Sequence, residues 1–170
     1  EDENKMEQPI ISGIAYSRDE AKLVVLGVPD KPGIAYQILG PIAAANIDVD
    51  MIIQTVSQDG QTDFSFTVPR NDTDRALKVL AGVREHVQAR AVLEDRTMAK
   101  VSIVGVGMRS HPGVASKMFR TLAEEGINIQ MITTSEIKIS VAIEEKYLEL
   151  AVRVLHRAFE LDKDPATVSV

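Results

Sequence analysis

Residues 26–52, LGVPDKPGIAYQILGPIAAANIDVDMI, have a second copy in this chain at residues 104–132, VGVGMRSHPGVASKMFRTLAEEGINIQMI. The copies align in type and order along their whole length, apart from a two-residue insertion before the second Pro-Gly. Gly33 and Gly113 are about 80 residues apart, which is longer than the repeat of a solenoid. We therefore expect each copy to be a small domain with its own core.

The residue pattern around the first copy predicts the order βαββαβ. Residues 22–28 are apolar and β-branched, as in a strand, and Ile34, Ile38 and Ile42 recur at helical spacing. Pro41 lies inside this helix and is expected to kink or shorten it. The remaining predicted elements are strands over 47–56 and 62–68 joined by a hairpin turn, a helix over 71–83 and a strand over 89–95.

The second copy repeats this order but ends before a full last strand. Its predicted elements are a strand over 101–106, a helix over 113–125, strands over 127–135 and 137–143, and a helix over 146–160. Only the short candidate strand ATVSV follows. Residues 10–17, IISGIAYS, form a predicted strand that precedes the first copy and has no place in it. We expect this strand to complete the second sheet.

The predicted fold is therefore α+β, with two ferredoxin-like βαββαβ domains in tandem. The first domain is predicted over residues 18–97. The second is predicted over residues 98–170, with strand 10–17 added to its sheet. In such a domain, both helices cover one face of an antiparallel sheet. Met51 and Met131 lie on alternating strands and are predicted to be core residues.

The composition excludes several classes of function. The net charge is −6 and aromatic residues make up 4% of the chain, which argues against nucleic acid or an anionic membrane as a partner. The chain has no cysteine, which excludes disulfides and thiolate metal sites and fits a reducing cytoplasm. We see no apolar run of about 18 residues and no signal peptide.

The remaining motifs do not predict a metal or cofactor site. The three histidines, His86, His111 and His156, lack metal-ligand spacing, so we expect no metal. His86 and His156 are predicted to be solvated, whereas His111 lies in a turn and could contact a ligand. A G-x-G motif begins at Gly105, but Ser110 occupies the place of the third glycine of a dinucleotide fingerprint. We expect no cofactor.

The turns PDKPG (29–33) and RSHPG (109–113) each join a strand to a helix. The N-terminus of a helix attracts a carboxylate through its unpaired N–H groups. A glycine without a Cβ lets a ligand approach the backbone closely. Asp30 either caps the helix or receives a ligand ammonium. A free amino acid carries both charges, so it suits such a turn. The alternative is that both turns have only a structural role, because a duplication would also preserve a structural turn.

Four segments, GVPDKPGIA, NIDVDMIIQTVS, VGMRSHPGVASK and INIQMITTSEIKISV, resemble the regulatory region of the aspartate kinases, a tandem pair of ACT domains. The resemblance runs from about Ile11 to Phe159. It implies a cytoplasmic unit that binds lysine and/or threonine and transmits feedback inhibition to a separate kinase domain. It also implies a homodimer or a heteromer with a kinase-bearing subunit, in which an internal start near Met6 yields the small subunit. The family's kinase domain is not in this sequence, so we expect no catalytic activity from the chain alone.

The resemblance also implies two effector sites, each taking one copy's turn and a strand segment of the other copy. The first site would use Asp30, Lys31, Pro32, Gly33, Ile34, Ala35, Gln54, Asn128 and Ile129. The second would use Met108, Ser110, His111, Pro112, Gly113, Val114, Ala115, Asp48, Val49 and Asp50, with Ser135 and Glu136 nearby. The carboxylates of the second site favour lysine, whereas the amides of the first favour threonine.

Three other functions were weighed against this one. An ACT-type sensor could regulate a different metabolic enzyme. An enzyme fragment acting on amino acids or nucleotides is disfavoured, because no nucleophile–base pair or phosphate-binding loop occurs. A ferredoxin-like nucleic-acid or scaffold module is disfavoured by the acidity and by the scarcity of aromatic residues.

Overall fold

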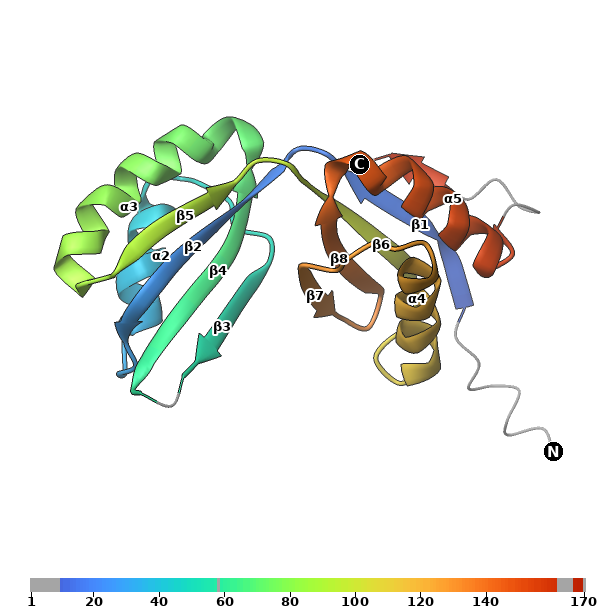
Figure 1. Cartoon of the computed structure of the whole chain (residues 1–170), viewed down its shortest axis with the longest axis horizontal. Coiled ribbons are helices and arrows are strands. Elements are labelled where there is room, and N and C mark those ends of the chain that lie inside the picture. The colour runs from blue at the N-terminus through green and yellow to red at the C-terminus, as the bar shows by residue number, and fades with distance from the viewer. Residues whose placement is uncertain (1–9, 58, 162–166, 170) are drawn as a thin grey trace. The chain divides into compact units, whose positions relative to one another are not determined.

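The computed structural model describes residues 10–57, 59–161 and 167–169. The chain divides into two compact units (Figure 1). We call residues Asp19–Arg96 the central unit, and the described residues before and after that range the terminal unit.

The central unit is a four-stranded sheet with two helices. Its elements are β2 (Glu20–Pro29), α2 (Ile34–Ala44), β3 (Ile52–Val56), β4 (Gln61–Pro69), a 3₁₀ turn (Arg70–Asp72), α3 (Thr73–Val87) and β5 (Ala91–Asp95). The strand order is β3-β4-β2-β5, and every neighbouring pair is antiparallel. This is the predicted βαββαβ arrangement.

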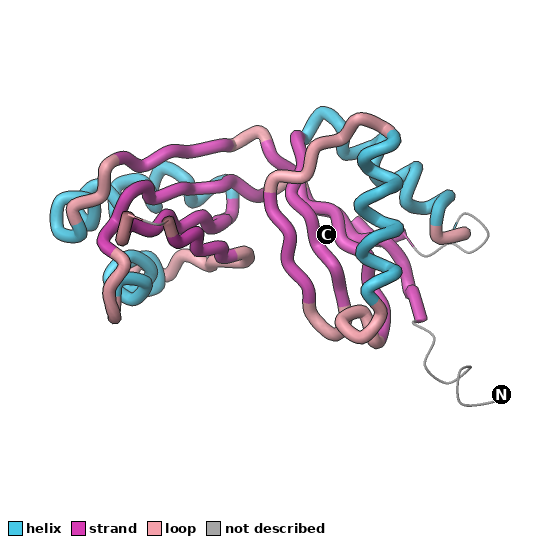
Figure 2. The backbone as a smooth tube through the Cα atoms, turned by 60° about the horizontal axis from the view of Figure 1, so that its bottom comes forward, coloured by secondary structure: helices cyan, strands magenta, loops and turns pink. Residues whose placement is uncertain are grey.

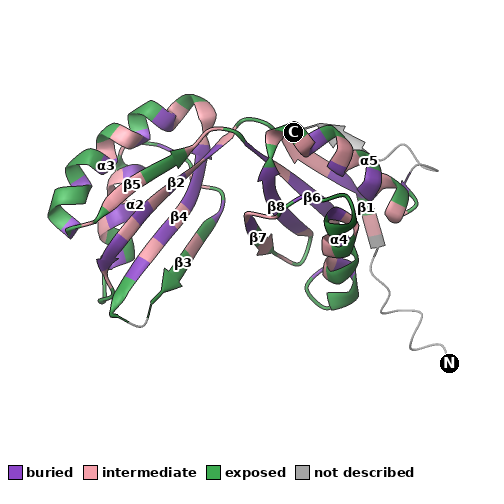
Figure 3. Cartoon of the chain, viewed as in Figure 1, coloured by how far each residue is buried: buried purple, intermediate pink, exposed green. Residues whose placement is uncertain are grey.

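The core of the central unit follows from the two periodicities of its sequence. Alternate residues of β2 are buried, as is visible along the strand in Figure 3. On α2, the buried residues are Ile34, Ile38 and Ile42, which recur every four positions. These isoleucines pack with Phe64 and Phe66 of β4 in one apolar cluster. The stripe of α2 and the inner face of the sheet therefore bury each other.

The terminal unit contains a five-stranded sheet. Its elements are β1 (Ile10–Ser17), β6 (Met98–Val106), α4 (Pro112–Glu124), β7 (Met131–Thr134), β8 (Lys138–Glu144), a 3₁₀ turn (Glu145–Tyr147), α5 (Leu148–Ala158) and β9 (Thr167–Ser169). The strand order is β7-β8-β6-β1-β9, and α4 and α5 lie on one face of the sheet (Figure 2).

The N-terminal strand takes the place beside β6 that β5 takes beside β2. β1 pairs antiparallel with β6, with Ile14 opposite Ile103, and both side chains are buried. The prediction that strand 10–17 completes the second sheet is therefore confirmed. The short C-terminal strand β9 then pairs with β1 in parallel and adds a fifth strand.

Two strand predictions were too long. β3 begins at Ile52, not at residue 47, and β7 covers only Met131–Thr134 of the predicted 127–135. Before β3, the N–H of Met51 donates to the hydroxyl of Thr67 at 3.0 Å, while the N–H of Thr67 donates to the carbonyl of Met51 at 3.0 Å. A side chain thus replaces a regular ladder bond there. The core prediction for Met51 and Met131 is confirmed, since both are buried.

Pro41 does not shorten α2, and a kink at this residue stays a prediction. The helix continues through Pro41 to Ala44, and Ala44 corresponds in the repeat to Glu124, the last residue of α4. A proline inside a helix removes one backbone hydrogen bond to the preceding turn. The carbonyl of Pro41 still accepts the N–H of Ala45 at 3.1 Å, which closes the last turn.

Ser102 on β6 and Ser140 on β8 form a polar pair inside the terminal unit. They lie opposite each other, each is buried, and their hydroxyl oxygens are 2.6 Å apart. We expect Ser102→Ala to lower the free energy of unfolding by about 1 kcal/mol, because the Ser140 hydroxyl loses its partner. Replacing both serines by alanine should cost less than the sum of the single changes. Urea denaturation measures this, and strictly additive losses would contradict it.

Candidate functional site

The first turn joins β2 to α2 in the central unit. Gly33 immediately precedes α2 and has a φ of +87°, a left-handed conformation that favours glycine. The N–H of Asp30 donates to the carbonyl of Gly60 at 2.9 Å, which holds the turn against the β3–β4 hairpin. The N–H of Ile34 donates to the carbonyl of Lys31 at 3.2 Å. The backbone of the turn is therefore held at both ends.

The N-terminus of α2 is open to a ligand. Within the described residues, no side chain caps this helix, so Asp30 does not act as its N-cap. The first bond into the helix runs from the N–H of Gln37 to the carbonyl of Gly33 at 3.0 Å. The N–H of Ala35 has no backbone partner in the described part of the chain. The N–H of the exposed residue Ala35 and the exposed Asp30 carboxylate thus occur at the same turn, as an amino-acid ligand requires.

The second turn joins β6 to α4 in the terminal unit and is closed by a histidine. Gly107 has a φ of +74°, and its carbonyl lies 2.7 Å from Nδ1 of His111. His111 directly precedes Pro112, the first residue of α4, and its own N–H donates to the carbonyl of Met108 at 3.4 Å. The two-residue insertion therefore forms a bend that the imidazole ring stabilises. Contact between His111 and a ligand stays a prediction.

The loop between β7 and β8 lies against the second turn. The N–H of Met108 donates to the carbonyl of Glu136 at 3.0 Å, and the N–H of Gly105 donates to the carbonyl of Ile137 at 2.7 Å. The Ser135 hydroxyl accepts the N–H of Lys138 at 3.2 Å, so it belongs to the loop's own hydrogen bonds. Glu136, whose side chain is exposed, is thus placed beside this turn within one unit.

The strand residues assigned to the two sites lie in both units. Gln54 on β3 is opposite Phe64, so its side chain lies on the core face of the sheet, although it is exposed at the edge. The segment after α2 carries Asp48, Val49 and Asp50, and the equivalent segment after α4 carries Asn128 and Ile129. The expected use of each segment in the other copy's site stays a prediction.

Some residues assigned to the sites have buried side chains. Ile34, Met108 and Val114 belong to the two apolar cores, so only their backbone groups could face a ligand. The exposed members of the turns are Asp30, Lys31, Pro32, Gly33, Ala35, Ser110, Pro112 and Gly113. These exposed residues form the surface that a ligand would meet.

The histidine predictions were correct for one residue and wrong for another. His86 on α3 is exposed, as predicted. His156 on α5 is half-buried, and its Nε2 is a buried atom with no hydrogen-bond partner in the described part of the chain. The error has a structural cause, because α5 packs against β1, a strand from the other end of the sequence.

Metal-ligating side chains do not gather in the described part of the chain, where no group of three His, Asp or Glu residues could hold a metal ion. Among the same residues, no helix combines the length and the apolar character needed to cross a membrane.

Comparison with known proteins identifies the family. Residues 22–85 and residues 101–159 each match a model of the ACT domain. The crystal structure of aspartokinase alpha and beta subunits contains a chain that is 61% identical, with a TM-score of 0.83. The match covers 88% of this chain and 99% of that one. The chain belongs to the aspartokinase family, as its regulatory region.

Two further aspartokinases agree with this assignment. The ligand-free regulatory subunit of aspartate kinase from Thermus thermophilus is 41% identical with a TM-score of 0.85, and the match covers 88% of this chain and 99% of that subunit. An aspartate kinase from Stutzerimonas stutzeri is 67% identical over 95% of this chain, which corresponds to 39% of that enzyme. The chain thus spans about two-fifths of the curated relatives that it matches.

These matches confirm the predicted resemblance to the aspartokinase regulatory region. The chain corresponds to the regulatory part of aspartokinase and not to its kinase domain. Its two ACT domains are units of allosteric regulation of aspartate kinase.

Proposed function

We propose that the chain binds lysine and/or threonine at its two turns and thereby transmits feedback inhibition to an aspartate kinase. The observation that carries this proposal is the repeated turn. Both helices that follow the turns lack a side-chain cap among the described residues. In the second turn, the N–H of Val114 donates to the carbonyl of His111 at 3.0 Å, which corresponds to the bond from Ile34 to Lys31 in the first turn. An α-carboxylate can accept hydrogen bonds from the unpaired N–H groups at the start of such a helix.

A structure of one relative supports lysine as a ligand. Aspartokinase III from Escherichia coli was crystallised in complex with lysine and aspartate. Its match to this chain covers 91% of the chain at 25% identity, with a TM-score of 0.67. The match includes both units of this chain, and it is therefore consistent with lysine binding by this chain.

We further propose that the chain acts in the cytoplasm together with a kinase-bearing aspartokinase chain, or as a homodimer. The similar aspartokinase structure contains alpha and beta subunits, which supports a partner of this kind. The proposed target is the ATP-dependent phosphorylation of aspartate by that partner, and the chain itself contributes amino-acid binding.

The two turns are proposed to differ in specificity. The first turn shares its unit with Gln54, whose amide suits the hydroxyl of threonine. The second turn lies beside Glu136, whose carboxylate suits the side-chain ammonium of lysine. We therefore propose threonine at the first turn and lysine at the second.

Variants at these two positions test the assignment. We expect Gln54→Ala to lower threonine affinity about fivefold and to leave lysine affinity unchanged, because one hydrogen bond of about 1 kcal/mol is lost. Glu136→Gln should lower lysine affinity by a similar factor. The loss is no larger, because Glu136 is exposed and solvent screens its ion pair with the ligand ammonium.

Titration of each variant with both amino acids provides the control, since each variant should retain the other ligand. If Gln54→Ala loses lysine and keeps threonine, the assignment is reversed. If neither variant changes either affinity, these side chains do not face the ligands.

A further inference from the structure

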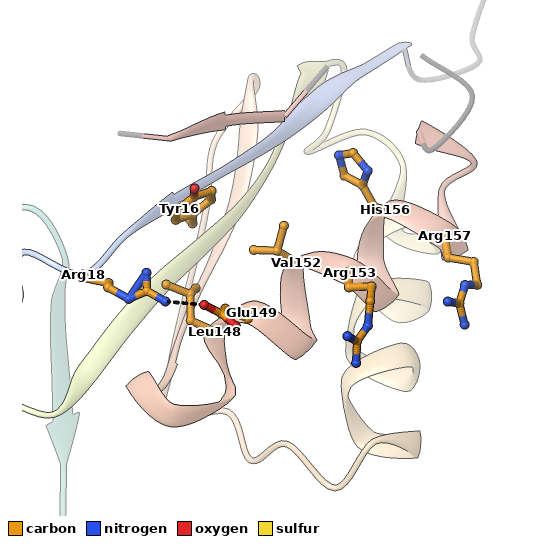
Figure 4. A pocket seen from close by; sticks show the side chains of 8 residues that line it. All are labelled: Tyr16, Arg18, Leu148, Glu149, Val152, Arg153, His156 and Arg157. Atoms are coloured by element: carbon orange, nitrogen blue, oxygen red, sulfur yellow. Dashed lines mark ion pairs between the residues drawn. The ribbon is translucent and has the colours of Figure 1, made fainter. Parts of the chain in front are cut away.

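A pocket of about 380 Å³ lies between β1 and α5 of the terminal unit (Figure 4). It has no residue in common with either turn. One side of the lining is apolar and is formed by Tyr16 on β1 with Leu148 and Val152 on α5. Arg153, His156 and Arg157 of α5 also line the pocket. The pocket thus combines an apolar wall with cationic side chains.

The two arginines on α5 lack an acidic partner in the described part of the chain. Arg153 and Arg157 are one helical turn apart, an arrangement in which like charges repel each other. Within the described ranges, neither guanidinium has an acidic partner. The acidic residue of the pocket, Glu149, pairs instead with Arg18 at 3.6 Å, as drawn in Figure 4. The pocket therefore keeps two cations that an anion could bridge.

His156 gives a second, independent indication of a ligand. His156 lines the pocket, and its Nε2 is a buried atom that has no hydrogen-bond partner among the described residues. Buried polar atoms without partners are uncommon and costly in native structures. A small rotation of this half-buried ring would let Nε2 meet a ligand oxygen bound in the pocket.

The internal repeat shows that these cations are not a requirement of the fold. In the central unit, Arg96 follows β5 and pairs with Asp74 at 2.6 Å, and Asp74 is the second residue of α3. In the terminal unit, Arg18 follows β1 and pairs with Glu149, the second residue of α5. The ion pair is therefore common to both copies.

Beyond this ion pair the two helices differ. Counting from their first residues, Arg153 corresponds to Lys78, His156 to Ala81 and Arg157 to Gly82. The central unit thus has alanine and glycine where the terminal unit has histidine and a second arginine. The histidine and the second arginine are specific to the terminal unit.

We propose that this pocket binds a small organic anion, with its phosphate or carboxylate oxygens on Arg153 and Arg157 and its apolar part against Tyr16 and Val152. Guanidinium groups suit both kinds of oxyanion, because their planar donors match two oxygens at once. The apolar wall adds affinity by burying carbon surface of the ligand. This site is separate from the two turns and does not depend on what they bind.

The test uses the 170-residue chain and three probes that differ in charge. Phenyl phosphate and benzoate each carry an aromatic body and an oxyanion, whereas benzyl alcohol is neutral. NMR follows the imidazole signals of His156, with the exposed His86 on α3 as the internal control. We expect saturable shifts of His156 with at least one of the anions, none with benzyl alcohol at the same concentrations, and none at His86. The stronger anion shows whether phosphate or carboxylate is preferred.

Variants decide whether the arginines hold the anion. The double variant Arg153→Gln/Arg157→Gln should bind the preferred anion at least about tenfold more weakly, since two charged contacts are lost. Lys78→Gln, the equivalent change on α3, should bind it as the unmodified chain does. The proposal is overturned if neither anion shifts His156, if benzyl alcohol binds as tightly as the anions, or if the double variant retains full affinity. An equal loss in Lys78→Gln would also overturn it.

Discussion

Asp30→Asn should weaken amino-acid binding at the first turn about tenfold. The Asp30 carboxylate is exposed, and in the described part of the chain it is not used to cap α2. Its backbone N–H is bound to the carbonyl of Gly60, so the residue is fixed while its charge remains available for a ligand ammonium. A hydrogen bond to a charged group contributes about 1.5 kcal/mol or more, which corresponds to about tenfold in affinity. Titration calorimetry with threonine and lysine measures the change.

The matched control is Glu85→Gln, which removes one exposed carboxylate from α3 of the same unit. This variant should bind as the unmodified chain does. The thermal stability of Asp30→Asn should also be unchanged, because the side chain caps no helix. Undiminished affinity in Asp30→Asn would show that the ligand ammonium does not bind at this carboxylate.

Phe66→Ala should lower the free energy of unfolding of the central unit by about 3–5 kcal/mol. Phe66 is fully buried on β4, opposite Leu23 of β2 and Ile52 of β3, and it packs within the core beneath α2 and α3. Its removal leaves a cavity that close-packed neighbours fill only in part. Urea denaturation measures the loss, and hydrogen exchange should show it as reduced protection of β2 and β4.

Ile52→Ala is the matched control for Phe66. Ile52 is directly opposite Phe66 in the sheet but is 51% exposed, so its truncation should cost far less. A similar loss in both variants, or a loss below about 1 kcal/mol in Phe66→Ala, would contradict the description of this core.

Much of the fold can be predicted from the sequence, because each helix and strand of the two repeats buries one face. The alternation along β2 and the four-residue spacing of Ile34, Ile38 and Ile42 arise directly from packing against one core. The pairing of β1 was predictable for another reason. The second copy lacked a full last strand, and a strand without a partner preceded the first copy.

The first residue of β3 was not predictable from the alternation of polar and apolar residues. The segment before β3 alternates in burial as a strand does. There the N–H of Met51 donates to the Thr67 hydroxyl while the N–H of Asp50 donates to the Thr67 carbonyl at 3.2 Å, so the regular ladder is interrupted. A side-chain hydroxyl that accepts a hydrogen bond in place of a backbone carbonyl leaves no signal in the hydrophobic pattern. Pro41 is a similar case, because the remaining bonds of α2 tolerate the loss of one.

The two turns were predictable from the sequence, but the bonds that hold them were not. The repeated Pro-Gly indicated both turns, whereas the bond between Gly107 and His111 depends on a bend that the two-residue insertion forms. The contact between Met108 and Glu136 joins segments that are distant in sequence and is made by backbone atoms. The burial of His156 depends on β1, so the residues around His156 alone gave no indication of it.

We propose that this regulatory chain binds lysine and/or threonine at its two turns. Isothermal titration calorimetry of the purified 170-residue chain, with each amino acid alone and with both together, tests it most directly. We predict saturable binding of at least one of the two amino acids, weakened by Asp30→Asn for a ligand at the first turn and by Glu136→Gln for a ligand at the second. A folded chain that binds neither lysine nor threonine, alone or together, would contradict the claim.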